Sequence, residues 1–317
     1  MMGLKGSPRK LATAVLLIAL LLLPVAALGL SNPFLIKLVT RAVIMAIAAL
    51  SLDIILGLGG MVSFSHAVFL GVGGYVVAIA ASQGQYSAWV QWPLALGLSA
   101  LISLVIGAVS LRSKGVYFIM ITLAFCQLFY FLAIGTEAYG GDDGLAIPTR
   151  STLGGLIDLS NKVTFYYFCF FCLLACLLFA WRLSRSHFGR VLRAAALNEE
   201  RVQALGISTY GYKLAAFVIA GTMCGLAGVL LANHNDFVSP ALLGWMQSGD
   251  LIVMLVLGGM GTLVGPIVGA LILLLIEHTL STVTEHWQII LGPVLVLMAL
   301  YSHGGLAAFL PKGRRRG

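Results

Sequence analysis

Charge is scarce in this chain. Charged residues make up 9% of its 317 residues, whereas hydrophobic residues make up 60%. A soluble domain carries about 25% charged residues, so this composition excludes one. Apolar runs long enough to cross a bilayer as a helix, roughly 20 residues, recur along the sequence. The alternating polarity of a transmembrane barrel is absent. The sequence therefore predicts an all-α polytopic membrane protein.

Cysteine is also scarce, and its placement excludes a disulfide framework. All five cysteines fall inside apolar runs. Cys169, Cys172 and Cys176 share a helical face, but no histidine or carboxylate accompanies them to complete a metal site. We interpret the cysteines as small, polarizable packing residues and expect no metal.

The residues that an enzyme would need are missing too. No Gly-Lys dipeptide occurs, so the chain has no Walker A phosphate-binding loop. Ser65, His66 and Asp53 come nearest to a catalytic triad, but adjacent Ser and His side chains diverge on a helix. We therefore expect no catalytic activity and no cofactor in this chain. If ATP drives the protein, partner subunits hydrolyse it.

Hydropathy predicts one transmembrane domain, 1–317, with about 8–10 membrane-spanning helices. The candidate spans are 11–30, 35–56, 65–82, 89–111, 115–134, 163–181, 213–232, a composite region 249–276, and 287–303. The first span resembles a signal peptide, but its apolar run exceeds the about 7–15 residues of a secretory one, so we expect it to be retained. The longer hydrophilic loops are 135–162 and 182–212.

Basic residues predict the orientation, because Lys and Arg collect on the cytoplasmic side. They cluster at both termini, around Arg112 and Lys114, and within 182–213. All these clusters lie inside, with both termini cytoplasmic, only if the composite region 249–276 forms a hairpin. Loop 135–162 is then external and loop 182–212 cytoplasmic. The acidic residues expected outside are Glu137, Asp142, Asp143, Asp158, Asp236, Glu277 and Glu285.

Glycine interrupts two of the apolar runs in a similar way. The segment "LGLGGMVS" at 56–63 matches "LVLGGMGT" at 255–262. Interrupted helices in the two halves of a chain point to a transporter's site, so we interpret the pair as a candidate inverted repeat. A broken helix offers N–H groups to a carboxylate and carbonyls to an ammonium. The alternative is that these glycines only pack helices. The predicted pathway residues are Asp53, Gly59, Gly60, Ser63, Ser65, His66, Gly258, Gly259, Thr262, Gly265 and Pro266.

The cytoplasmic loop carries an amphipathic pattern in "SRSHFGRVLRAAALNEERVQALGIS". Val191, Ala195, Val202 and Leu205 form one apolar helical stripe, and Gly206 is a helix stop. Such a helix docks into a groove on a partner protein or lies on anionic lipid.

Four motifs in order resemble one known family. They are the loop just quoted with its continuation "TYGYKLAAFVIAGTMCGLAGVL", "GGMVSFSHAVFLGVGGY", "YGGDDGLAIP" and "LGGMGTLVGPIVGA". Together they extend from about residue 45 to 275 and resemble the LivM-type permeases of ATP-binding-cassette importers for branched-chain amino acids. Asp53 stands where the family often has Asn, and Ser65 where Gly often precedes the histidine. These departures concern the cargo more than family membership.

The resemblance implies a type II importer-like permease in the bacterial plasma (inner) membrane that carries amino acids inward by alternating access. Its implied partners are cytoplasmic ATP-binding-cassette ATPases, a second homologous permease, an extracytoplasmic substrate-binding protein and membrane lipid, with no nucleic acid. The implied ATPase-coupling residues are Gly189, Arg190, Arg193, Glu199, Glu200, Ala204 and Gly206. For external docking or gating they are Gly141, Asp142, Asp143 and Gly144, where a solvated turn is the alternative.

Two other functions remain open at this point. The same importer family could carry urea or short amides, because a broken-helix pocket suits any small polar solute. A stand-alone secondary transporter or channel also fits repeat-built, interrupted helices. The basic cytoplasmic loop favours the importer, since an ion-coupled carrier has no evident need for it.

Overall fold

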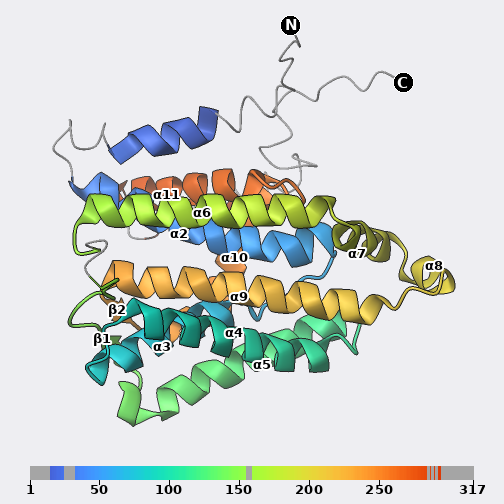
Figure 1. The fold of residues 1–317 in the computed structure, drawn as a ribbon, viewed down its shortest axis with the longest axis horizontal. Coiled ribbons are helices and arrows are strands. Elements are labelled where there is room, and N and C mark those ends of the chain that lie inside the picture. The colour runs from blue at the N-terminus through green and yellow to red at the C-terminus, as the bar shows by residue number, and fades with distance from the viewer. Residues whose placement is uncertain are drawn as a thin grey trace, which may run out of the picture.

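The computed structural model describes residues 15–24, 33–154 and 159–283, together with residues 286, 289, 292 and 293. Within them the chain is almost entirely helical (Figure 1). Most of the expected last span, both terminal basic clusters, Asp158 and Glu285 lie outside the described residues. The helices are α2 Pro33–Asp53, α3 His66–Ser82, α4 Ala88–Ser110, α5 Val116–Gly135, α6 Lys162–Arg185, α7 His187–Leu197, α8 Glu199–Ala204, α9 Thr209–Asn235, α10 Trp245–Gly258 and α11 Gly265–Val283. The shorter elements are the π-helix η1 Ile54–Leu58, the 3-10 helices η2 Glu137–Tyr139 and η3 Pro240–Leu243, and the strands β1 Leu145–Ala146 and β2 Phe237–Val238.

Six of the described helices are long and apolar enough to cross a membrane, which confirms the all-α polytopic fold. These are α2 with its π-helical extension, α4, α5, α6, α9 and α11. Three shorter apolar helices are Val15–Pro24, α3 and α10. The predicted spans up to residue 232 each fall on one of these helices, and the composite region falls on two.

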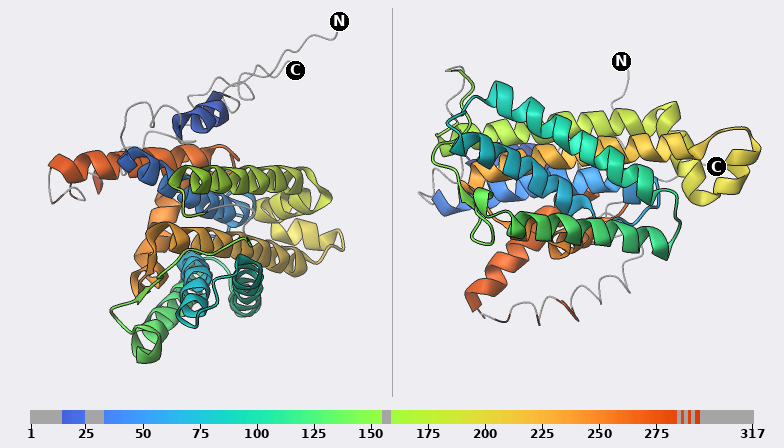
Figure 2. Two further views of the ribbon diagram at one scale, coloured as in Figure 1. Left: turned by 60° about the vertical axis from the view of Figure 1, so that its left-hand side comes forward. Right: turned by 90° about the horizontal axis from the view of Figure 1, so that it is seen from below.

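The helices lie side by side between two ends of the molecule (Figures 1 and 2). Helices α7 and α8 project at one end, which we call the α8 end. At the other end, the β end, β1 pairs antiparallel with β2, and Leu145 lies opposite Val238. Because α2, α4 and α6 run toward the α8 end and α5 and α9 run back, the loops alternate between the two ends.

Helix α2 is the centre of the bundle, and α5 is its edge. In the apolar 18-residue window of each helix, 89% of the window is buried in α2 with its π-helical extension, but only 17% is buried in α5. Helix α2 packs against α6, α9, α10 and α11. The exposed side chains of α5 include Tyr117, Met120 and Phe131, which suit contact with lipid or with another membrane chain.

Small residues allow α9 to approach its neighbours closely. Gly221, Gly225 and Gly228 form a strip on α9 that packs inside the chain. A Cβ at Gly221 would collide with Ser103 of α4, and one at Gly228 with the carbonyl oxygen of Leu70 in α3. Helix–helix contacts in membranes favour such small residues because backbones can then touch.

The composite region forms a hairpin of α10 and α11. A Cβ at Gly258 would collide with the carbonyl oxygen of Gly265, and one at Gly269 with that of Met254. These two pairs of neighbours place the helices antiparallel and side by side. The hairpin on which the predicted orientation depends is therefore present, although α11 is a full-length helix and not a short segment.

The two glycine-rich turns lie on the same side of the molecule, not on opposite sides. The Phe34 and His278 rings lie 4.8 Å apart, and Gly261 contacts Asp53, so α11 runs antiparallel to α2. Helix α10 consequently runs in the same direction as α2. The two motif copies are thus related in parallel, and the inverted relation expected for them is not found.

Most of the described basic residues lie at the α8 end, although Lys37, Arg41, Arg150 and Lys162 lie toward the β end. Arg112, Lys114 and the basic residues from the end of α6 to the start of α9 lie at the α8 end. The described acidic residues of the predicted external side, Glu137, Asp142, Asp143 and Asp236 among them, lie at the β end. The described helices therefore alternate as the charge pattern predicts.

Candidate functional site

The two glycine turns end their helices in the same way. The Gly60 N–H donates to the Leu56 carbonyl at 3.1 Å, and Gly60 has φ +66°. At the aligned positions, the Gly259 N–H donates to the Leu255 carbonyl at 2.9 Å, and Gly259 has φ +109°. Glycine adopts positive φ without steric cost, so the shared Gly-Gly dipeptide explains why both helices stop here.

A buried carboxylate joins the two turns. The Gly261 N–H of the second turn donates to Asp53 Oδ1 at 2.7 Å, and Asp53 is only 2% exposed. A Cβ at Gly57 would collide with that same oxygen and with the Gly261 nitrogen. Asp53, predicted as a pathway residue, therefore cross-links the turns, and the absence of a side chain at position 57 permits the contact.

Most hydroxyl groups of the turns are engaged locally. Ser63 Oγ and Ser65 Oγ hydrogen-bond each other at 2.9 Å, and Thr262 Oγ1 donates to the Gly259 carbonyl at 2.7 Å. His66 differs, because neither of its ring nitrogens has a hydrogen-bond partner among the described residues, although the side chain is fully buried. A buried polar group without a partner is costly, so His66 is the predicted pathway residue with unused hydrogen-bonding capacity.

The remaining predicted pathway residues of the second turn pack the hairpin. Gly258, Gly265 and Pro266 are all buried between α10 and α11. Ser248 of α10, by contrast, was not predicted. Its hydroxyl donates to the Phe64 carbonyl at 2.5 Å and accepts from the Ala67 N–H at 2.8 Å, so it connects α10 to the start of α3. A lone serine in an apolar helix was the sequence signal for it.

The loop predicted to be cytoplasmic, 182–212, forms two helices and not one. Asn198 ends α7 and caps α8, since its Oδ1 accepts from the Arg201 N–H at 3.0 Å. Gly206, with φ +82°, follows the end of α8 as predicted.

This division changes the apolar stripe. Val191, Ala195 and Val202 are buried as expected, but Leu205 is 78% exposed, so its assignment to the stripe is wrong. Leu205 lies just past the end of α8 at Ala204, so the helical spacing that relates it to Val202 does not extend to it. Leu197 is 89% exposed as well, and the two leucines give the tip of the loop an apolar character that the periodicity did not predict.

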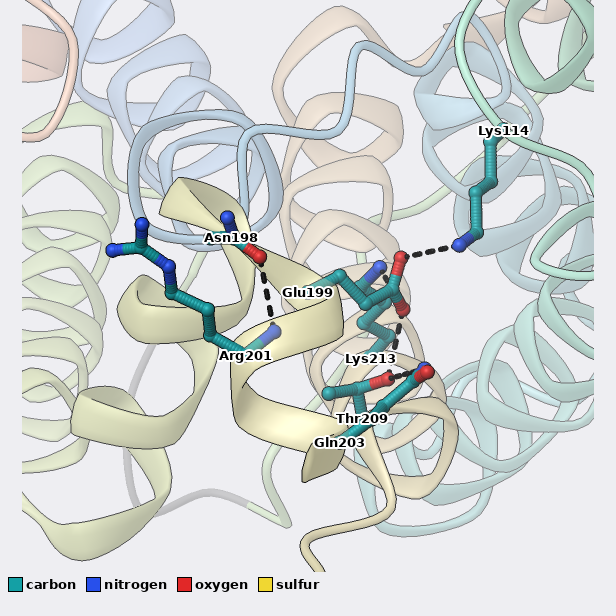
Figure 3. A network of polar contacts seen from close by, with 7 residues as sticks. All are labelled: Lys114, Asn198, Glu199, Arg201, Gln203, Thr209 and Lys213. Carbon is teal, nitrogen blue, oxygen red and sulfur yellow. Dashed lines mark hydrogen bonds and ion pairs between the residues drawn. The ribbon is translucent and has the colours of Figure 1, made fainter. Parts of the chain in front are cut away.

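Glu199 anchors α8 to the rest of the chain (Figure 3). Its Oε1 accepts from Lys213 Nζ at 2.7 Å and from Thr209 Oγ1 at 2.8 Å, both at the start of α9. Its Oε2 lies 3.0 Å from Lys114 Nζ in the α4–α5 loop. Burial raises the pKa of Glu199, but hydrogen bonds from Lys213, Thr209 and Lys114 outweigh burial and lower that pKa to about 2. The carboxylate is therefore ionised and fully engaged within the chain.

The predicted coupling residues divide into internal and exposed groups. Gly189 is buried in the first turn of α7, where a Cβ would collide with the Leu183 carbonyl of α6. Glu199 is the second internal residue. The exposed residues are Arg190, Arg193, Glu200, Ala204 and Gly206.

The loop lies directly against the first glycine turn. A cavity of about 350 Å³ is lined by residues 59–62, by the α4–α5 loop and by residues 195–199. A Cβ on Gly60 would lie 3.3 Å from the Cβ of Ala196 in α7. A displacement of α7 would therefore change the contact between Ala196 and Gly60.

The predicted external loop is an ordered turn at the β end. Gly141 is buried, whereas Asp142 and Asp143 are exposed, which agrees with a solvated turn. A Cβ at Gly144 would collide with the Val238 carbonyl of β2. Farther along, Arg150 forms an ion pair of 3.0 Å with Asp236, which fixes this loop to the end of α9.

These features define a class of protein before any comparison is made. Apolar helices of membrane length surround two interrupted helices whose turns meet at a buried carboxylate, and a basic helical loop contacts one turn. This is the architecture of a polytopic membrane permease.

Comparison with known proteins identifies the family. The family "Branched-chain amino acid transport system / permease component" matches residues 34–299, and the chain belongs to it. The chain is 29% identical over 313 residues to the high-affinity branched-chain amino acid transport system permease protein LivM of Escherichia coli (strain K12), covering 92% of this chain and 74% of the relative. LivM of Salmonella typhimurium (strain LT2) matches at the same identity and coverage.

A more distant relative shares about half of the chain. The autoinducer 2 import system permease protein LsrC of Salmonella paratyphi B is 31% identical over 154 residues, which is 46% of this chain and 44% of the relative. No solved structure matches significantly.

Proposed function

We propose that this chain is the permease subunit of an ATP-binding-cassette importer that carries branched-chain amino acids into the cytoplasm by alternating access. The observation that carries the proposal is the contact between α7 and the first glycine turn, at Ala196 and Gly60. It places a surface loop directly against the interrupted helix. Family membership supports the cargo, because the family and the LivM relatives are described as branched-chain amino acid transport permeases.

The α8 end faces the cytoplasm in this proposal, since its basic residues follow the positive-inside rule. Cytoplasmic ATPase subunits contact the exposed residues of α7 and α8, including Arg190, Arg193 and Glu200. The exposed side chains of Leu197 and Leu205 supply the apolar part of this surface. An extracytoplasmic binding protein delivers substrate at the β end, and a second permease subunit completes the pathway.

Glu199 has a different role from its exposed neighbours. Its carboxylate binds Lys114, Lys213 and Thr209, so it transmits movement and does not contact the ATPase. When ATPase closure moves α8, this anchor moves α9 and the α4–α5 loop with it. At the same time, Ala196 moves against Gly60, and the first glycine turn changes its conformation next to Asp53.

Co-purification and uptake test this function together. The tagged chain is purified in mild detergent from its native cells, and its partners are identified by mass spectrometry. We expect stoichiometric ATPase subunits, a second permease and ATP-dependent leucine uptake in reconstituted vesicles. Purification of the chain alone, or uptake of urea in place of leucine, contradicts the proposal.

A loop variant gives the mechanistic control. Alanine at Arg190, Arg193 and Glu200 should reduce ATP-driven uptake by about 10-fold or more, because charged contacts at an interface are worth about 1–3 kcal/mol each. Arg182 is exposed on α6 at the same end, so Arg182→Ala is the matched control and should leave uptake unchanged. Equal uptake by the triple variant and this control would exclude the coupling surface.

A further inference from the structure

A second polar site lies away from the glycine turns, in the half of the bundle nearer the β end. Helices α2, α10 and α11 line an open cavity of about 490 Å³, where Arg41 and Asp250 are exposed. Each helix contributes one charged side chain to it: Arg41, Asp250 and Glu277. Charged residues inside membrane-spanning segments are costly and mark functional sites by default.

These three charges converge without neutralising one another. Asp250 lies within electrostatic range of both Glu277 and Arg41. Among the described residues, however, the ion pairs are Lys114–Glu199, Arg150–Asp236 and Lys213–Glu199, and none involves the cavity. The guanidinium and both carboxylates are therefore free to bind a ligand.

A metal ion does not fit the cavity well. The described part of the chain holds no cluster of three or more histidine, cysteine or carboxylate side chains suited to a metal. Hard cations also prefer six or more oxygen ligands, whereas the cavity offers two carboxylates and a competing guanidinium.

The rest of the cavity wall is largely apolar, with Gln247 as a further polar side chain. Met45 of α2, Val253 and Met254 of α10, and Leu273 and Leu274 of α11 line it. Small-ligand sites combine such a wall with a few converging polar groups that fix the orientation of the ligand. The cavity therefore offers one anion-binding group, two cation-binding groups and an aliphatic surface.

We propose that this cavity binds the free α-amino acid during transport, with the α-carboxylate on Arg41, the α-ammonium on Asp250 and Glu277, and the aliphatic side chain against the leucine, methionine and valine wall. A guanidinium matches a carboxylate through two parallel hydrogen bonds. Urea and short amides carry no charge and would leave all three ionised groups without a partner. This inference rests on the proposed function and specifies its substrate site, which is distinct from the turns at Asp53.

Ligand analogues allow each contact to be tested separately. The membrane complex is purified free of soluble binding protein, and the unfolding of this chain is followed through a fluorescent fusion. L-Leucine should raise Tm in a concentration-dependent way. Leucine without its amino group, 4-methylpentanoate, and leucine without its carboxylate, 3-methylbutylamine, should each bind about 10-fold more weakly or worse.

Substitutions then locate the effect. Arg41→Gln should weaken leucine binding by about 10-fold or more and abolish the preference for leucine over 3-methylbutylamine. Asp250→Asn should also weaken leucine binding by about 10-fold or more, and it should abolish the preference for leucine over 4-methylpentanoate. Lys37→Gln is the matched control, because Lys37 lies one turn before Arg41 on α2, is exposed and does not line the cavity. It should bind leucine like the unaltered chain.

Several results would overturn the site. It is excluded if the unaltered chain shows no Tm rise with leucine, if urea or sodium ions give the larger rise, or if Arg41→Gln and Lys37→Gln behave alike. Should a variant fail to fold, the analogue series on the unaltered chain still decides. Leucine uptake is measured separately. If the complex takes up leucine but leucine does not bind at this cavity, the proposed site is excluded and the proposed function stands. If leucine binds at the cavity but is not taken up, the proposed function is excluded and the site stands.

Discussion

The two glycine turns share a motif and a helix-ending geometry, yet their surroundings differ. The second turn, residues 259–264, is closed by backbone contact, because Gly258 lies against the carbonyl oxygen of Gly265. The first turn opens into the non-helical segment 59–65 and lies against Ala196 of α7. One motif therefore supports two different elements. The second turn is a rigid support, and the first is the turn that the cytoplasmic loop can reach.

The largest effect is expected where the second turn is tightest. Gly258→Ala places a methyl group on the carbonyl oxygen of Gly265, which belongs to the backbone and cannot move aside. We expect a loss of stability of about 3 kcal/mol, measured by thermal unfolding in detergent. Gly59→Ala, at the aligned position, should cost less, because one of its two close neighbours is the flexible end of Met61.

Gly97→Ala is the control for this pair. Gly97 lies inside α4, and a methyl group added there would have no neighbouring atom within 4 Å. The substitution should be neutral or stabilising, because alanine favours helix by about 1 kcal/mol over glycine. Equal losses at positions 258 and 59 would remove the distinction between a rigid and a movable turn.

The next effect concerns the connection between the turns. Asp53→Ala removes the acceptor of the Gly261 N–H, a part-buried hydrogen bond to a charged group, at a cost of about 1–3 kcal/mol. Asp53→Asn keeps an acceptor oxygen and should cost less than half as much. Thermal unfolding of the two variants checks this order. If asparagine is as harmful as alanine, charge and not hydrogen bonding holds the second turn in place.

A smaller effect, on activity, should follow from the contact between the loop and the first turn. Glu199→Gln removes the charge that binds Lys114 and Lys213, so α8 no longer moves α9 and the α4–α5 loop together. We expect about a 10-fold fall in uptake per ATP hydrolysed, while the complex still assembles. Glu137→Gln is the control, since this acid is exposed at the β end and makes none of these contacts. If Glu199→Gln shows an unchanged ratio of uptake to ATP hydrolysis, the contacts of Glu199 do not take part in coupling.

The sequence predicted the parts of this comparison that local chemistry determines. The Gly-Gly dipeptide foretold both turns, since positive φ requires glycine, and charge placement required the α10–α11 hairpin. The motif does not indicate the direction in which each helix runs. The parallel relation of the two copies therefore became evident only from the structure, through the contact between Gly261 and Asp53. Leu205 was misassigned because α8 ends at Ala204, before the periodic pattern does. The partners of Glu199 lie on other elements, the α4–α5 loop and α9. The sequence around Glu199 does not show that these elements fold against α8, so its contacts could not be predicted.

The smallest effect is a pH dependence that isolates Glu199 itself. Hydrogen bonds from Lys213, Thr209 and Lys114 hold its pKa at about 2 in the folded chain, below its usual 4.5. A folded-state pKa that is lowered stabilises the fold fully above the unfolded pKa, and this contribution is lost as pH falls from about 4.5 toward 2. The Tm difference between the unaltered chain and Glu199→Gln should therefore be constant from about pH 8 to 6 and narrow below about pH 4.5. The two chains differ in no other titratable group, so the narrowing of this Tm difference reports the Glu199 carboxylate alone. A difference that does not change with pH would mean that Glu199 stabilises α8 through packing, and the first turn would then depend on the shape of the loop and not on its charge.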